Sequence, residues 1–428
     1  MKQIVDRFPS GTINIPLSKS EAHRILICAA LAGKDSFAHV LDDWESAGFE
    51  LSEDIRATAA AMKTIVFGDV TGGEVDCCES GSTLRFLLPV AAMNACPWTF
   101  TGRGRLLERP MDVFKKLFVE HGALYEQVPE GITVKGPLPA GKYELPGDVS
   151  SQFVSGLLFA LPLAKKSDES VSEIRLTSSL ESANYVDLTI DAMRAYGISI
   201  KEIYDPSGLI IGWDVPAGQQ YLDKGTDPMS CSGDWSQAAF FLCAGALGRD
   251  VSLAGLDPDS KQGDRRIAEI IGSMGASVRM TYEPGRAFGL VQAFPPAAGE
   301  TLHGVIIDAR DIPDIVPPLA ALACFASGET RFVGAGRLRL KESDRLAALA
   351  EELGKIGADI NETPDGLIIR GTGGGKLPGG PAMAHGDHRI VMSLAVASIG
   401  CESPVLIDGA ESVAKSYPNF WIDFLKNS

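Results

Sequence analysis

The segment Gly336–Leu346 combines residue types that can bind an anion and move a proton. Lys341, Glu342 and Arg345 fall within five residues, just where an apolar helix is predicted to begin. The free N–H groups and partial positive charge of a helix N-terminus attract anions, and added cations strengthen that attraction. Glu342 supplies a carboxyl group whose protonation the neighbouring cations can tune. Taken alone, the segment also fits a helix capped by Ser343 with solvated charges around it.

The same combination recurs at the N-terminal turns of six predicted helices and of the helices that follow them. Arg there offers bidentate contacts to phosphate or carboxylate, and Lys offers a point charge. Asp314 and Glu342, placed among cations, suit proton transfer to and from a substrate. So many equivalent polar turns favour one shared polyanion site over separate helix caps. The turns carry Lys19, Ser20, Arg24, Ser82, Thr83, Arg85, Arg109, Ser150, Ser151, Gln152, Ser182, Tyr185, Asp314, Lys341, Glu342, Arg345, Asp387, His388, Arg389 and Lys415.

The sequence contains no complete motif for nucleotide binding, for metal binding or for a catalytic serine. The glycine-rich segment Gly371–Lys376 is followed by Leu377 instead of the Ser or Thr of a P-loop, and no dinucleotide-binding glycine fingerprint occurs. His385, Asp387 and His388 would need a further ligand to hold a metal, so a metal site is disfavoured. No Gly-x-Ser-x-Gly elbow is present. These patterns indicate a transferase without cofactor or metal that handles at least two anionic substrates.

Composition indicates an ordinary globular chain with two cores. The 428 residues are 45% hydrophobic and 22% charged. The net charge of −16 without a basic stripe argues against a nucleic-acid partner. Eight scattered cysteines suggest buried free thiols in a reducing compartment. No uninterrupted apolar run of membrane-spanning length occurs, and the first functional motif starts at Pro16, so we expect a cytoplasmic protein without a membrane partner.

A helix with a polar first turn and a small apolar body recurs six times, which predicts six α/β repeats of about 70 residues. The copies span 18–31, 80–92, 150–163, 233–247, 312–326 and 386–399. Second helices follow near Ile55, Met111, Tyr185, Arg265, Ser343 and Tyr417, and four of them run into a glycine C-cap: Gly122, Gly197, Gly275 and Gly357. Strands are expected at 12–15, 132–135, 172–176, 251–253, 330–333 and 405–407. The turn-rich section 212–234 predicts a domain boundary with three repeats on each side.

The order and wording of the motifs resemble the 5-enolpyruvylshikimate-3-phosphate synthase family from end to end. The resemblance implies an inside-out α/β fold of two domains, each with three βαβαββ repeats. The first domain would span 19–231, on the shikimate-phosphate side. The second would comprise 1–18 with 232–428, so that the N-terminal strand joins it, and the active site would lie in the cleft between the domains. The motifs are Pro16–Ser20, Glu79–Arg85, Glu108–Pro110, Ser150–Gln152, Lys341–Arg345, Asp387–Arg389 and Ala414–Pro418.

The resemblance also implies an activity and a set of site residues. Family members transfer the enolpyruvyl group of phosphoenolpyruvate to the 5-hydroxyl of shikimate 3-phosphate and release phosphate, on the route to chorismate and aromatic amino acids. The residues implied for shikimate 3-phosphate are Lys19, Ser20, Arg24, Ser150, Ser151, Gln152, Ser182, Tyr185, Asp314, Arg337 and Lys341. Those implied for phosphoenolpyruvate are Lys19, Gly81, Arg109, Gln152, Arg345, Arg389 and Lys415. Proton transfer falls to Asp314 and Glu342, with Lys19 as a further candidate.

Two departures from the family's wording and two alternative functions stay open at this stage. The glycine loop reads Glu79-Ser80-Gly81-Ser82 instead of the commoner Asn-Ala-Gly-Thr, which leaves sensitivity to the inhibitor glyphosate open, and Arg337 stands where Asn is frequent. The sister enzyme acting on UDP-N-acetylglucosamine usually has a Cys shortly before Arg109-Pro110, and none occurs here. A non-catalytic anion-binding scaffold is the other alternative. Six internal repeats favour a monomer.

Overall fold

The computed structural model describes residues 1–68, 71–165, 170–282 and 288–426. The chain forms two compact units, one made of Lys19–Cys231 and the other of Met1–Ser18 with Ser232–Ser428. The chain therefore passes between the units at two places, 18–19 and 231–232. Near the second crossing, the Ser18 N–H donates to the Ser232 carbonyl at 2.7 Å, so the two connections are paired within one unit.

The unit Lys19–Cys231 begins with three helices and continues with two complete βαβαββ repeats. The three helices are α1 (Lys19–Ala32), α2 (Lys34–Ser46) and α3 (Glu53–Phe67). The next repeat contains β3 (Gly73–Asp76), α4 (Gly81–Ala91), β4 (Trp98–Thr101), α5 (Asp112–Glu120), β5 (Leu124–Val128) and β6 (Gly131–Lys135). The last contains β7 (Lys142–Leu145), α6 (Ser151–Ala160), β8 (Val171–Leu176), α7 (Ala183–Ala195), β9 (Lys201–Tyr204) and β10 (Ile210–Pro216).

The other unit takes strands from the N-terminus to complete its repeats. One repeat contains β2 (Gly11–Asn14), α8 (Trp235–Ala246), β11 (Val251–Leu256), α9 (Ile267–Ser273), β12 (Ser277–Thr281) and β13 (Gly289–Phe294). Another contains β14 (Ile306–Asp308), α10 (Val316–Ala323), β15 (Glu329–Val333), α11 (Arg345–Lys355), β16 (Asp359–Thr363) and β17 (Gly366–Arg370). The third contains β1 (Lys2–Val5), β18 (Gly380–Met383), α12 (His388–Ala397), β19 (Val405–Asp408) and α13 (Phe420–Phe424).

Four of the sheets share one strand order, which confirms that these segments are repeats of one unit. In each, the first strand pairs parallel with the second, and the fourth lies antiparallel between the second and the third. The orders are β3-β4-β6-β5, β7-β8-β10-β9, β2-β11-β13-β12 and β14-β15-β17-β16. Among the described residues, one further sheet has three strands, β1-β19-β18. The four predicted C-cap glycines all have positive φ, from 71° at Gly122 to 106° at Gly357.

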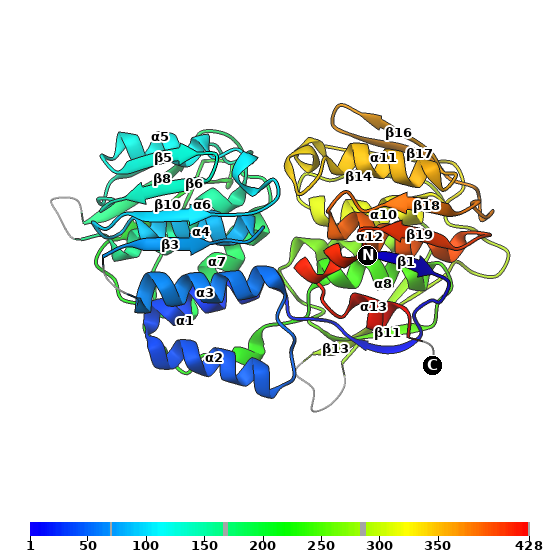
Figure 1. The fold of residues 1–428 in the computed structure, drawn as a ribbon, viewed down its shortest axis with the longest axis horizontal. Coiled ribbons are helices and arrows are strands. Elements are labelled where there is room, and N and C mark those ends of the chain that lie inside the picture. The colour runs from blue at the N-terminus through cyan, green and yellow to red at the C-terminus, as the bar shows by residue number, and fades with distance from the viewer. Residues whose placement is uncertain (69–70, 166–169, 283–287, 427–428) are drawn as a thin grey trace. The chain divides into compact units, whose positions relative to one another are not determined.

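The helices with small apolar bodies lie inside the units, and the sheets lie around them (Figure 1). Every residue of α8, α10 and α12 is buried. In the other unit, α4 packs closely on α6, and only a few residues of either helix are partly exposed. Helices that are apolar all round are expected to be enclosed in this way. The predicted inside-out arrangement therefore follows from the apolar helix bodies.

The first repeat differs from the other five. Among the described residues it contributes α1, α2 and α3, which pack together, but no sheet of its own (Figure 1). The prediction of six equivalent βαβαββ units is therefore corrected for this segment, where α2 stands in place of strands. Phe37, Val40 and Trp44 bury one face of α2, and the Trp44 indole N–H donates to the Pro228 carbonyl at 2.9 Å.

Candidate active site

Arg345 is the centre of a buried ion cluster in the unit that contains Ser232–Ser428. Its side chain is only 1% exposed and contacts three carboxylates. One terminal nitrogen lies 2.8 Å from Asp314 Oδ1, the other lies 2.7 Å from Glu342 Oε2, and Nε lies 2.8 Å from Asp387 Oδ2. Asp314 comes from the short helical turn Pro313–Ile315 before α10, and Asp387 precedes α12. One guanidinium thus brings together both predicted proton-transfer residues.

Arg345 is the first residue of α11, and the helix cap before it uses different groups from the ion cluster. Asp344 is the N-cap, and its side chain accepts a hydrogen bond from the Ala347 N–H at 3.1 Å. Ser343, the cap suggested by the sequence, instead donates its hydroxyl to Asp387 Oδ2 at 3.0 Å. A carboxylate at an N-cap also interacts favourably with the helix dipole. The cap and the ion cluster are therefore separate sets of contacts, and only the cluster reaches the neighbouring helix α12.

Three further predicted cations complete the cluster. Lys341 Nζ lies 3.5 Å and Arg389 Nε lies 3.3 Å from Asp314 Oδ1, and Lys415 Nζ lies 3.2 Å from Glu342 Oε1. With Arg345, these make four cations against the three carboxylates Asp314, Glu342 and Asp387. The excess of positive charge suits an anionic ligand, although the chain as a whole is acidic.

The cluster fixes the protonation state of Asp314. Burial by itself would raise the pKa of this carboxyl, but Arg389, Lys341 and Arg345 hold it well below its usual range. Burial lowers the pKa of Lys341, with Asp314 opposing the effect. Burial would also lower the pKa of Arg345, but Asp387, Glu342 and Asp314 raise it overall. Asp314 is therefore ionised near neutral pH.

Arg337 lies beside the cluster, in the helical turn Gly336–Leu340. Its terminal NH2 group donates to the carbonyl oxygen of Arg310. Its charge contributes to the lowered pKa of Lys341, so it lies near enough to act on the cluster electrostatically. Its contact with a substrate stays a prediction.

In the unit Lys19–Cys231, the predicted residues of α1 are tied to α3 and α7. Lys19 Nζ lies 2.8 Å from Asp54 Oδ2 on α3. Arg24 is 3% exposed, and it donates to Thr189 Oγ1 at 2.8 Å and to the Tyr185 carbonyl at 2.6 Å. Burial lowers the pKa of Arg24 to about 10, with Tyr185 opposing the effect. Arg24 therefore fastens α1 to α7 in addition to its predicted substrate contact.

The N-terminal turn of α4 gathers a second set of polar groups. Arg85 donates to Gln152 Oε1 at 2.9 Å, and Gln152 Nε2 donates to Ser82 Oγ at 2.9 Å. Arg109 lies against the turn so closely that a Cβ on Gly81 would stand 2.7 Å from one guanidinium nitrogen. The predicted residues Gly81, Arg109 and Gln152 are thus brought together. Arg85 and Ser82 join them, although the sequence analysis assigned neither to a substrate.

The close approach at Gly81 leads to a testable prediction. The resemblance implies that Gly81 contacts phosphoenolpyruvate; on that expectation, Gly81→Ala should raise KM for phosphoenolpyruvate about 10–100-fold, because the added methyl group forces the Arg109 guanidinium away from the turn. The displaced group is the end of a flexible side chain, so Tm should fall by only a few degrees. Steady-state kinetics with each substrate varied in turn would check this. An unchanged KM, or a KM that rises only for the other substrate, would contradict it.

Four predicted hydroxyl groups start α6 and α7. Ser150 is the N-cap of α6 and accepts from the Gln152 N–H at 3.3 Å, and Ser151 is the first helical residue. Ser182 precedes α7 with φ of 57°, a left-handed conformation that few non-glycine residues adopt. The Glu181 N–H donates to the Gly147 carbonyl at 3.0 Å, so the loops before α6 and α7 lie side by side. Tyr185, in the first turn of α7, completes this group.

The sequence analysis assigned no ion-pair role to two further carboxylates, Asp387 and Asp54, that hold predicted cations. Asp387 was seen only as a residue of a helix start, yet it is fully buried and bonded to Arg345. Asp54 is 4% exposed and pairs with Lys19. One sequence feature could have pointed to them, since each is an acidic residue at the N-terminal end of a helix, α3 for Asp54 and α12 for Asp387. The partner of Asp387 lies in another repeat, and that of Asp54 lies 35 residues away on another helix of the first repeat, so local spacing could not identify either pair.

The residues of the disfavoured metal motif, His385 and Asp387, contact different groups in the structure. His385 Nε2 lies 2.7 Å from Glu352 Oε1, whereas Asp387 faces Arg345. Glu351, Glu352 and His385 do come close together, but Lys355 Nζ lies within 2.8 Å of both glutamates. A lysine in that position supplies the positive charge that a cation would otherwise bring.

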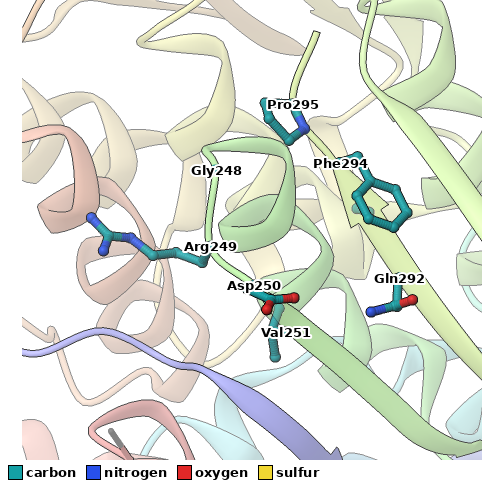
Figure 2. Close-up of a pocket in the computed structure, with 8 residues that line it drawn as sticks. Gly248, Arg249, Asp250, Val251, Gln292, Phe294 and Pro295 are labelled. Carbon is teal, nitrogen blue, oxygen red and sulfur yellow. The ribbon is translucent and has the colours of Figure 1, made fainter. Parts of the chain in front are cut away.

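A small pocket in the same unit contains none of the predicted residues. It lies between the end of α8 and the strands β11 and β13, where Gly248–Val251 face Gln292–Pro295 (Figure 2). The predicted site residues gather instead around Arg345 and at the helix N-termini of the other unit.

Comparison with known proteins decides the family. The family model for EPSP synthase (3-phosphoshikimate 1-carboxyvinyltransferase) matches residues 7–424. The chain belongs to the EPSP synthase family. A 3-phosphoshikimate 1-carboxyvinyltransferase of Clostridium novyi is 41% identical over 97% of this chain and 95% of its own length. One from Clostridium perfringens is 40% identical over the same shares.

Solved structures agree with this assignment. EPSP synthase from Acinetobacter baumannii superposes with a TM-score of 0.73 at 25% identity, over 99% of this chain and 98% of that one. The enolpyruvyl transferase NikO from Streptomyces tendae shares the fold, with a TM-score of 0.66 at 16% identity, over 99% of this chain and 96% of that one. The predicted EPSP synthase family, fold class and transferase activity in the shikimate pathway are confirmed, and the UDP-N-acetylglucosamine alternative is not favoured.

The cysteines and the helix lengths bear on the expected cellular environment of the chain. All eight cysteines are free thiols, and five of them are buried. Among the described residues, no helix combines the length and the apolar character needed to cross a bilayer.

Proposed function

We propose that this EPSP synthase family member transfers the enolpyruvyl group of phosphoenolpyruvate to the 5-hydroxyl of shikimate 3-phosphate through the residues described above. The observation that carries the proposal is the junction at Arg345, where Asp314 and Glu342 lie within 2.8 Å of one guanidinium in a cluster with excess positive charge. That arrangement offers two proton-transfer groups beside an anion site, as an addition followed by an elimination requires.

The proposed chemistry uses the two carboxylates in opposite roles. Asp314, which is ionised, accepts the proton of the 5-hydroxyl as its oxygen bonds to C2 of phosphoenolpyruvate. Glu342, which is paired with Arg345 and Lys415 in the structure, must first take up a proton, and it then delivers this proton to the C3 methylene carbon, giving a tetrahedral intermediate. Glu342 then takes a proton back from C3, while phosphate leaves C2 and takes the proton held by Asp314, which restores the enol ether and returns both carboxyl groups to their starting states. Lys19 is a further proton-transfer candidate in the other unit.

We assign five cations to phosphoenolpyruvate, and we assign the hydroxyl groups together with the remaining cations to shikimate 3-phosphate, with Lys19 shared between the two substrates. Preorganised cations stabilise the leaving phosphate without reorganisation during the reaction. The phosphoenolpyruvate set is Lys19, Gly81, Arg109, Gln152, Arg345, Arg389 and Lys415, and the shikimate 3-phosphate set is Lys19, Ser20, Arg24, Ser150, Ser151, Gln152, Ser182, Tyr185, Asp314, Arg337 and Lys341. The two sets draw on both compact units, so we propose that the units act as two domains on one pair of substrates.

Three finer statements belong to the same proposal. The enzyme acts as a monomer in the cytoplasm, it uses neither a metal nor an organic cofactor, and glyphosate is a ligand to titrate against phosphoenolpyruvate. Size-exclusion chromatography with light scattering tests the first statement. Assays after exhaustive chelation test the second, since activity should persist unchanged. Inhibition that is competitive with phosphoenolpyruvate would support the third.

The decisive experiment is an acceptor comparison. Phosphate release from phosphoenolpyruvate is measured with shikimate 3-phosphate and, separately, with UDP-N-acetylglucosamine. Release with shikimate 3-phosphate alone is expected. Release with the UDP-sugar would assign the chain to the sister activity. Tight binding of phosphoenolpyruvate without release in either mixture would support the non-catalytic scaffold.

A further inference from the structure

Four buried side chains connect three helices of the unit Lys19–Cys231 by a continuous chain of hydrogen bonds. His23 Nδ1 on α1 lies 2.7 Å from Thr58 Oγ1 on α3. Thr58 Oγ1 lies 2.6 Å from Thr83 Oγ1 on α4, and Thr83 Oγ1 lies 2.7 Å from Ser80 Oγ. All four residues are at most 1% exposed. The chain ends at Ser80, the N-cap of α4, directly beside Gly81.

The direction of the chain follows from its last link. Ser80 Oγ accepts both the Thr83 N–H, at 3.2 Å, and the Thr83 hydroxyl hydrogen. Thr83 has then used its only hydroxyl hydrogen, so Thr58 must donate to Thr83, and His23 must donate from Nδ1 to Thr58. A neutral imidazole does this. Burial lowers the pKa of His23 to about 3, with Asp54 opposing the effect and Lys19 and Arg24 adding to it.

With donation running from His23 towards Ser80, the Ser80 hydroxyl group is left with a hydrogen to donate. The hydroxyl hydrogen of Ser80 has no acceptor among the described residues, although Ser80 is 1% exposed. A buried donor without an acceptor is costly, and such groups are found where a ligand or water supplies the acceptor. Ser80 also stands where the commoner wording of the family has alanine. The spare donor is thus a feature that this chain has and an alanine-containing loop lacks.

We propose that Ser80 donates its hydroxyl hydrogen to bound phosphoenolpyruvate, and that His23, Thr58 and Thr83 are positioning residues that hold this donor in place. The inference rests on the proposed function, because it places phosphoenolpyruvate at the α4 turn. The location is suitable: the turn offers backbone N–H groups of an 11-residue helix, and Arg109 and Arg85 both lie against Gly81. A hydroxyl donor there adds a directional contact to an otherwise ionic site.

Ser80→Ala tests the donor directly. A hydrogen bond to a charged group corresponds to roughly a tenfold or larger change in affinity, so KM for phosphoenolpyruvate should rise about tenfold or more. KM for shikimate 3-phosphate should change less than twofold. Alanine is the commoner residue at this position, so the variant is expected to fold. An unchanged KM for phosphoenolpyruvate would overturn the proposal.

A second set of variants distinguishes positioning of Ser80 by Thr58 from a general effect of Thr58 on stability. Thr58→Val interrupts the chain and lowers Tm whether or not the chain acts on Ser80, so KM is the deciding quantity. We expect KM for phosphoenolpyruvate to rise several-fold, Thr58→Ser to restore it, and Ser80→Ala combined with Thr58→Val to match Ser80→Ala alone. Thr99→Val is the control, since it breaks a Thr–Thr hydrogen bond of 2.9 Å to Thr133 elsewhere in the same unit. A lower Tm with unchanged KM would refute the positioning role.

Direct binding keeps this inference distinguishable from the proposed function. Calorimetric titration of phosphoenolpyruvate into wild type and Ser80→Ala requires no turnover. Weaker binding to the variant supports the Ser80 contact even if phosphate release fails for wild type. Equal binding to both overturns the contact even if the transferase activity is present.

Discussion

Glu342→Gln is expected to lower kcat by about 10²–10⁴-fold, with KM for either substrate changed far less. An amide has nearly the same shape as the carboxyl group, and its oxygen can still accept from Arg345, which lies 2.7 Å from Glu342 Oε2 in the native protein. It cannot deliver a proton. The loss should therefore appear in the chemical step, measured as phosphate release at saturating phosphoenolpyruvate and shikimate 3-phosphate.

Glu362→Gln is the matched control for this prediction. Glu362 lies on β16 in the same unit, is 45% exposed, and also pairs with an arginine, Arg339, at 3.0 Å. Its replacement should leave kcat within about twofold, because exposed ion pairs contribute little. A kcat for Glu342→Gln within tenfold of wild type would remove Glu342 from the proton-transfer pair. Such a result with intact ligand binding is what the non-catalytic scaffold predicts.

Asp387→Asn is expected to reduce the free energy of unfolding by about 3–5 kcal/mol, the usual cost of removing one partner from a buried ion pair. Asp387 is fully buried and holds Arg345 Nε at 2.8 Å, and it also accepts from the Ser343 hydroxyl and the Arg389 N–H. Asparagine can keep some of these hydrogen bonds but not the charge. Arg345 would then keep ion pairs with only Asp314 and Glu342. Urea denaturation monitored by circular dichroism measures the difference.

Asp308→Asn provides the comparison for that experiment. Asp308 also pairs with an arginine, Arg310, at 2.5 Å, but its side chain is 41% exposed and that of Arg310 is 62% exposed. The expected cost is below about 1 kcal/mol, because water screens an exposed pair. Equal costs for the two variants would show that burial of the Arg345 cluster contributes nothing to stability. Because Asp387 touches Arg345 directly, activity should fall as well, but the stability difference is the discriminating result.

The sequence alone determined the features that depend on local pattern. Small apolar helix bodies predicted helices enclosed by their neighbours, and α8, α10 and α12 are buried at every residue. Glycines after the second helices predicted left-handed C-caps, as Gly357 shows with φ of 106°. The spacing of Lys341, Glu342 and Arg345 before an apolar run placed three members of the ion cluster within five residues. The ordered motifs were sufficient to identify the family.

Only the tertiary structure decided which groups face one another. Arg345 meets Asp387, 42 residues away, and Arg24 meets Thr189, 165 residues away. No local periodicity encodes such pairs, since they form when separate repeats pack together. The same holds for the first repeat, where α2 replaces the expected strands and packs through Trp44 against Pro228. Local sequence sets which face of a helix is apolar, but the partner of each polar group depends on how distant segments fill the shared core.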